Sequence, residues 1–163
     1  MSGMWRKDGA GSRGFVVIGR NEGERLVRCL RSLSRYRRAA TVVYVDSGST
    51  DESMKTAQQM GVVALLLPQD RPFTMARARN FGAQALRSIN PAIRWIQFVD
   101  GDCEMVRHWP GLARQYLKAN PDTAIVCGRR TERFLEQSIY NRLADLEWDT
   151  KPGRAAACGG DFL

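Results

Sequence analysis

Short apolar runs rich in β-branched and aromatic residues alternate with longer amphipathic stretches along most of this chain. Runs of this length and composition are typical of buried β-strands. We predict five strands, at residues 15–18, 42–45, 62–67, 94–99 and 123–127.

The amphipathic stretches between these runs have the period of an α-helix. In the first of them Leu26, Leu30 and Leu33 fall on one face, which is the pattern of a helix packed on a core. Thr74 is placed to cap a later helix, and Ser49 with Glu52 has the spacing of a capping box. We predict helices at residues 24–36, 49–60, 74–88, 109–120 and 135–148.

This alternation of strands and helices predicts an α/β fold with a mostly parallel, Rossmann-like sheet covered by helices on both faces. A chain of 163 residues suits one domain. We expect residues 1–14, which are polar and glycine-rich, to form a flexible N-terminus, and residues 15–163 to form the domain. Ligands of such folds bind beyond the carboxyl ends of the strands.

Polar clusters follow three of the predicted strands at that edge. Asp100 and Asp102 are one residue apart and could hold a divalent cation that bridges a diphosphate, while Gly101 allows close approach. Asp46 could accept hydrogen bonds from a base or ribose. Each cluster alone also fits a solvated turn, but their coincidence at one edge favours a ligand site. The remaining candidates in these clusters are Arg20, Asn21, Glu22 and Ser47.

Two further segments carry candidate site residues. The helix after Thr74 places Arg79 and Asn80 where they could neutralise phosphate, although a solvated helix face is the alternative. Near the end of the chain, paired glycines precede Asp161, whose carboxylate could bond a sugar hydroxyl.

The net charge of +8 and the 21 arginines indicate an anionic partner. A nucleotide diphosphate, a nucleic acid and an anionic membrane surface all fit, and the arginine face of the helix at 24–36 leaves peripheral membrane contact open. Four scattered cysteines and the single His108 form no zinc motif. Widely spaced thiols suit a reducing cytoplasm, so we expect a cytoplasmic protein, with the inner face of the membrane as an alternative.

Taken together, residues 20–22, 45–51, 78–82, 99–102 and 159–161 resemble the motifs of family 2 glycosyltransferases of the GT-A fold. The resemblance implies an inverting transfer from a nucleoside-diphosphate sugar of the UDP or GDP type to a saccharide or lipid-linked acceptor, with Mg²⁺ or Mn²⁺ as cofactor. It also implies a role for each site residue. Glu22 and Asp46 would hold the nucleoside, Asp100 and Asp102 the ribose and the metal, Arg79 the diphosphate, and Asp161 the sugar or the acceptor.

The chain departs from the family pattern in two places. Ile18 and Arg20 stand where the family often has a proline and an aromatic residue. The later acidic segment that carries the family's general base is not found, so we assign no catalytic base and expect a C-terminally truncated domain that binds donor without efficient turnover.

Two other functions are weighed against this one. A haloacid-dehalogenase-like phosphatase also has two aspartates one residue apart after an apolar strand, but in its first strand, and here Glu104 stands where that class has threonine or valine. A basic nucleic-acid-binding module would explain the charge, yet no nucleic-acid motif with interleaved aromatic residues is found. We therefore expect no nucleic-acid partner.

Overall fold

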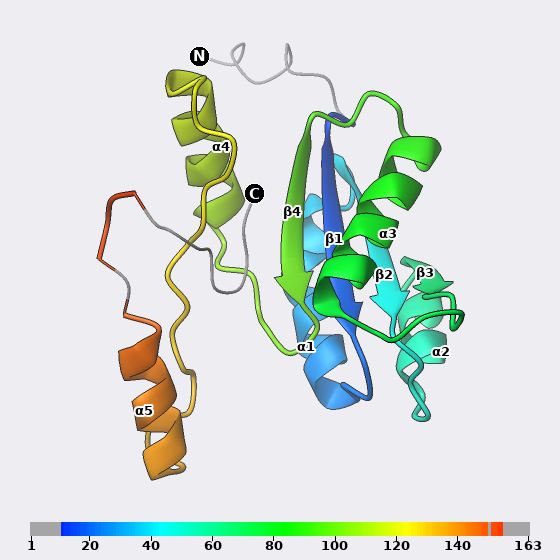
Figure 1. Ribbon diagram of the computed structural model, residues 1–163, viewed down its shortest axis with the longest axis horizontal. Helices are drawn as coiled ribbons and strands as arrows, with labels where there is room; N and C mark the ends of the chain where they lie inside the picture. Colours follow the sequence, from blue (N-terminus) through cyan, green and yellow to red (C-terminus); the bar gives the residue numbers. More distant parts are fainter. Residues whose placement is uncertain (1–10, 150, 155–163) are drawn as a thin grey trace.

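The computed structural model describes residues 11–149 and 151–154, and its centre is a parallel β-sheet (Figure 1). Four strands lie in the order β3-β2-β1-β4, and each hydrogen-bonded pair is parallel. The first four predicted strands are thereby confirmed. Their bounds are Arg13–Gly19 for β1, Ala40–Asp46 for β2, Val63–Leu66 for β3 and Trp95–Asp100 for β4.

The register of the sheet brings the ends of its central strands together. Gly19 at the end of β1 pairs with Asp46 at the end of β2, and Ile18 pairs with Asp100 at the end of β4. The polar segments that follow these strands therefore emerge side by side at one edge, as the sequence predicts for a parallel sheet.

One face of the sheet is covered by α1 (Glu24–Leu33), a short 3₁₀ turn (Ser34–Tyr36) and α2 (Ser53–Gln59). The predicted stripe of α1, formed by Leu26, Leu30 and Leu33, is buried. It packs on alternate residues of the strands, namely Phe15, Val17, Val42, Tyr44 and Val99.

The opposite face is covered by α3 (Met75–Ile89). Ala78 and Leu86 of α3 pack on Val16 and Val43 of the sheet. Thr74 caps this helix as predicted, because its side chain accepts a hydrogen bond from the Arg77 amide at 3.1 Å. Helices on both faces confirm the predicted α/β fold.

The last two described helices lie beside the sheet rather than over it (Figure 1). α4 (Trp109–Ala119) is joined to β4 by the Trp109 indole, which donates to the Gln97 Oε1 at 3.0 Å. α5 (Ile139–Glu147) begins four residues later than predicted, after a Ser138 cap, and none of its residues is buried. No described helix is long and apolar enough to cross a membrane.

Two predictions of local structure are wrong. Residues 123–127 do not form a fifth strand: the described sheet has four strands, residues 123–126 have no regular structure, Cys127 makes a single bridge, and Ile125 is 52% exposed. Ser49 and Glu52 do not form a capping box either. The Ser49 hydroxyl accepts from the Asn21 amide instead, so α2 begins only at Ser53.

Candidate functional site

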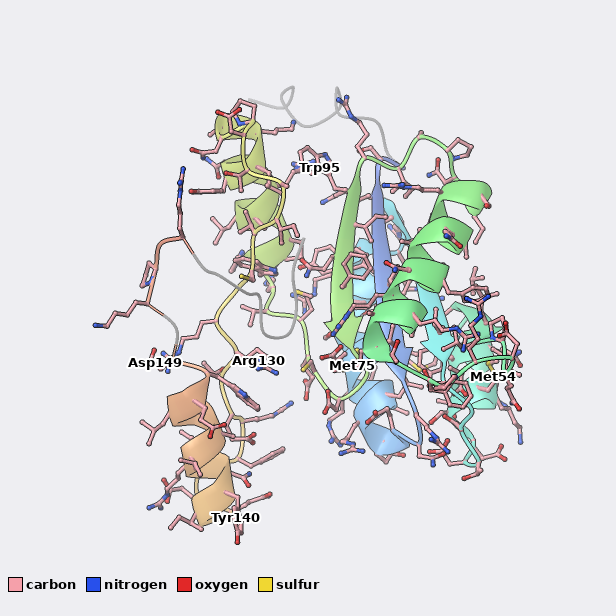
Figure 2. All side chains as sticks on the ribbon, viewed as in Figure 1. Met54, Met75, Trp95, Arg130, Tyr140 and Asp149 are labelled. Atoms are coloured by element: carbon pink, nitrogen blue, oxygen red, sulfur yellow. The ribbon has the colours of Figure 1, made fainter. Side chains whose placement is uncertain are left out.

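A pocket of about 310 Å³ opens where β1 and β4 end and α3 begins. In Figure 2, Met75 marks its position at the start of α3, beside the carboxyl ends of these strands. The pocket brings together six residues that the sequence singled out: Arg20, Glu22, Ser47, Asp100, Gly101 and Asp102. Its other lining residues are Ile18, Gly19, Phe73, Thr74 and Met75.

Asp100 is paired with Arg79 across the pocket edge. The Arg79 Nη2 donates to the Asp100 Oδ1 at 2.6 Å, and the two side chains are only 16% and 21% exposed. Alternate residues of a strand point to the same face, so Asp100 shares the face of Phe98, on which α3 packs. This register is what places the aspartate beside an α3 arginine.

Gly101 packs tightly against the end of β1. Its amide donates to the Ile18 carbonyl at 2.7 Å. A Cβ atom at this position would lie 3.0 Å from that carbonyl oxygen and 3.1 Å from the Glu22 Cγ. Glycine therefore allows the turn between Asp100 and Asp102 to sit directly on the first strand, with the exposed Asp102 at the pocket rim.

Glu22 lies between the ends of β1 and β4, close to Gly19 and Gly101. Burial raises the pKa of its carboxyl group, Arg25 at 3.0 Å lowers it, and the nearby Asp102 raises it further. The carboxylates of Glu22, Asp100 and Asp102 therefore lie at the same edge of the sheet, where Arg25 and Arg79 pair with two of them.

Asp46 is placed differently from the other candidates. It follows Tyr44 on the face covered by α1 and α2 and is 1% exposed. Its Oδ1 accepts from the Gly48 and Ser49 amides at 2.9 and 2.6 Å, and its Oδ2 accepts from the Tyr44 hydroxyl at 2.9 Å. Burial and Asp46 raise the pKa of Tyr44, so this hydroxyl stays protonated and donates. Asp46 shapes the loop after β2 and does not line the pocket.

Asn21 joins two loops and does not line the pocket either. With φ at 56°, it adopts the left-handed conformation that asparagine tolerates. Its amide donates to the Ser49 hydroxyl at 2.9 Å, and its Oδ1 accepts from the Thr50 amide at 2.7 Å. The loop after β1 is thereby fixed to the loop after β2.

Asn80 is not brought to this pocket. Asn80 is exposed on α3 and lines a second, separate hollow together with Pro68 and Arg77. Asp161 lies outside the described residues, so its predicted contact with the sugar or acceptor stays a prediction.

The sequence analysis missed the wall formed by Phe73, Thr74 and Met75. Phe73 lies between two groups: the Arg20 guanidinium is 5.7 Å from its ring centroid, and a Cβ on Gly48 would be 3.1 Å from its Cζ. Gly48 has a φ of 85°, a conformation that favours glycine. Topology could have indicated these residues. The segment before α3 follows β3, and the carboxyl end of this parallel strand lies at the same edge of the sheet as the pocket.

The part of the chain that the structure describes contains no group of three or more His, Cys, Asp or Glu side chains able to hold a metal. Asp100 and Asp102, which the sequence analysis assigns to a cation, both line the pocket, and their role as metal ligands stays a prediction.

Comparison with known structures identifies the fold. Glucosyl-3-phosphoglycerate synthase from Mycobacterium tuberculosis, solved with Mn²⁺, UDP and glucosyl-3-phosphoglycerate, has a TM-score of 0.60 and 18% identity, over 93% of this chain and 55% of that one. The mannosyltransferase PcManGT from Pyrobaculum calidifontis, solved with GDP-Man and Mn²⁺, has a TM-score of 0.56 and 22% identity, over 76% and 37%.

A third similar structure is residues 1–349 of TarS from S. aureus with UDP-GlcNAc. It has a TM-score of 0.54 and 16% identity, over 71% of this chain and 33% of that one. The chain therefore spans between about a third and just over half the length of these proteins. At these identities the likeness establishes the fold, which is that of GT-A glycosyltransferases.

Comparison of the sequence with protein families gives a more direct result. No curated protein sequence matches the chain significantly. The sequence profile described as "Glycosyl transferase family 2" matches residues 15–157, which is most of the chain. The chain therefore belongs to glycosyltransferase family 2.

Proposed function

We propose that this chain binds a nucleoside-diphosphate sugar in the pocket at the ends of β1 and β4, as the donor site of a family 2 glycosyltransferase. The observation that carries the proposal is the pocket itself, in which Asp100, Gly101 and Asp102 meet Glu22 and Ser47. The UDP, UDP-GlcNAc and GDP-Man bound to the similar structures support it. Family membership favours it over the phosphatase and the nucleic-acid-binding module.

The donor set fits Mg²⁺ or Mn²⁺. Asp100 and Asp102 supply hard oxygen ligands, and a site with so few protein ligands suits a cation that shares its coordination with water and phosphate oxygens. The Mn²⁺ in two of the similar structures agrees with this choice. When bound, the cation would neutralise charge on the diphosphate.

The residues of the chain would act mainly by binding the donor and by stabilising negative charge on its diphosphate. Transfer with inversion at the anomeric carbon requires the diphosphate to depart with growing negative charge. Arg79 is held at the pocket edge by Asp100, and Arg20 lines the pocket, so both could stabilise that charge. Glu22 and Ser47 would orient the nucleoside, while Asp46 and Asn21 would hold the loops that carry them.

The acceptor side of the reaction needs a group that removes a proton. A saccharide or lipid-linked hydroxyl would need a general base, and we assign none to the described residues. Asp161 remains a proposed contact of the sugar or acceptor. Donor binding with little or no transfer by these 163 residues is therefore what we expect.

Calorimetric titration of the chain tests the donor site. We expect UDP, GDP or both to bind in the presence of Mn²⁺, with an affinity at least about tenfold lower without the metal, because a diphosphate beside carboxylates needs a shared cation. Asp102→Ala should abolish this metal dependence. Asp122→Ala, an exposed aspartate away from the pocket, is the matched control and should leave it intact.

Two results would count against the proposal. Binding of both nucleotides without any metal dependence would reject Asp100 and Asp102 as a cation site. Absence of binding by folded wild-type protein, together with salt-sensitive binding of oligonucleotides, would support the nucleic-acid-binding module instead.

A further inference from the structure

The loop between β3 and α3, residues 68–73, supplies part of the pocket wall. Phe73 at its end lines the pocket, whereas residues 68–72 are exposed. Pro68 and Pro72 have no N–H group, so at these two positions the backbone offers only carbonyl acceptors. A donor outside the loop can anchor it through these carbonyls.

The side chain of Arg77, in the first turn of α3, provides that anchor. Its Nη1 donates to the Arg71 carbonyl at 2.6 Å and to the Pro72 carbonyl at 3.4 Å. Its Nη2 donates to the Pro68 carbonyl at 2.6 Å and forms an ion pair with Asp70. One guanidinium therefore binds both ends of the loop to the helix that follows it.

The geometry of this anchor needs an arginine. Guanidinium has five donors in a rigid plane, whereas a lysine ammonium is a single point of charge. The Arg77 side chain is 22% exposed, so much of its contact with the loop is sheltered from water. The Arg77 amide adds a further link by donating to the Thr74 hydroxyl, which is itself in the pocket wall.

The anchored loop delivers Phe73 to a defined place. The ring packs close to Gly48 of the loop after β2, and the Arg20 guanidinium lies over it from the end of β1. Three segments that follow different strands therefore meet at Phe73. Its position depends on the loop that Arg77 holds, although Arg77 itself lines only the second hollow.

We propose that Arg77 is a positioning residue of the donor pocket: it acts through the 68–73 loop to hold Phe73 as the apolar wall against which the donor packs. The identity of the ligand as a nucleoside-diphosphate sugar rests on the proposed function. The role of Arg77 in ordering Phe73 does not, because it can be measured without a ligand.

The first test uses the ligand-free chain. Backbone ¹⁵N heteronuclear NOE values at Phe73 and Thr74 should fall clearly in Arg77→Ala, with a smaller fall in Arg77→Lys. Arg87→Ala, an exposed arginine on the same helix, should leave them unchanged. Unchanged values in Arg77→Ala would overturn the proposal, whether or not the wild-type chain binds a nucleotide. If Arg77→Ala does not fold, the same comparison is made with Arg77→Lys.

The second test is a double-mutant cycle in nucleotide binding, with UDP and GDP in Mn²⁺. We expect Arg77→Ala and Phe73→Ala each to weaken binding by about tenfold, and the double variant to lose little more, because both changes remove one wall. Losses that multiply in the double variant, or no loss in Arg77→Ala, would show that Arg77 does not act through Phe73. Failure of the wild-type chain to bind would reject the proposed function, and the NOE comparison would still decide the role of Arg77.

Discussion

The surroundings of Glu22 disfavour the charged form of its carboxyl group. Burial raises the pKa of its carboxyl group above the usual 4.5, and the carboxylates of Asp102 and Asp51 raise it further, against the opposing effect of Arg25. A carboxyl group whose pKa is higher in the folded state binds a proton more tightly there. Its contribution to stability is fully present below the unfolded pKa and is lost as the pH rises through the folded pKa.

This linkage predicts how Glu22→Gln behaves. The free energy of unfolding of the variant, relative to wild type, should increase as the pH rises from about 4 to about 7, because the variant has no charge to bury. Urea denaturation at several pH values measures the difference. Glu147→Gln, at an exposed position of α5, should show no such trend. A difference that is constant with pH would show that Glu22 titrates as it does in the unfolded chain.

Asp46 and Asp100 both end a strand, and both were predicted to contact the ligand. Those contacts stay predictions, but the surroundings of the two carboxylates differ. Asp100 shares the face of Phe98 and pairs with Arg79 of α3, whereas Asp46 shares the face of Tyr44 and is buried, with the Tyr44 hydroxyl and two loop amides as its partners. The alternation of side chains along each strand predicts which residues share a face with each aspartate. The sequence alone did not show which helix covers that face.

At the scale of elements, α3 is the helix that both the sheet and the pocket depend on. It packs on β1 and β2 at Gly82, where an added Cβ would lie 2.4 Å from the Val16 Cγ1 and 3.0 Å from the Val45 Cγ2. Arg77 and Arg79 extend from the same helix to the loop and to Asp100. A displacement of α3 would therefore disturb the core and the site together.

Two glycine-to-alanine substitutions in helices test this packing. Gly82→Ala should lower the free energy of unfolding by about 1–3 kcal/mol, because the helix must move away from the sheet. Gly111→Ala in α4, where nothing lies within 4 Å of the new Cβ, should raise it by up to about 1 kcal/mol through helix propensity alone. Denaturant titration of both variants measures the two changes. Equal effects of the two substitutions would contradict the tight seating of α3.

The elements that the sequence predicted correctly are those with a strong local signal. Apolar runs defined β1 to β4, and the stripe of α1 and the cap of α3 were visible from spacing and residue type. The failures depended on distant partners. Residues 123–127 are apolar enough for a strand, but in the described part of the chain only Cys127 makes a bridge, and Ser49 bonds to Asn21 from another loop.

On the scale of the whole molecule, the pocket edge gathers charges of both signs within a basic chain. The carboxylates Glu22, Asp100 and Asp102 lie at one edge of the sheet, while the excess of arginine gives the chain a net charge of +8. Arg20 lines the same pocket, and Arg25 and Arg79 pair with two of the carboxylates, so groups able to bind a cation stand beside groups able to bind a diphosphate. We propose that the ligand binds at this edge.

The most direct test of that claim is to map the ligand by NMR on the ¹⁵N-labelled chain. With UDP or GDP, we expect shifts of the Gly19, Ser47 and Gly101 amide signals, and added Mn²⁺ should broaden Gly101 and its neighbours most. The signals of Gly61 and Gly111, away from the pocket, should remain unchanged. Shifts concentrated on the arginine face of α1, or broadening by Mn²⁺ that spares the turn at Asp100 to Asp102, would show that the ligand binds elsewhere.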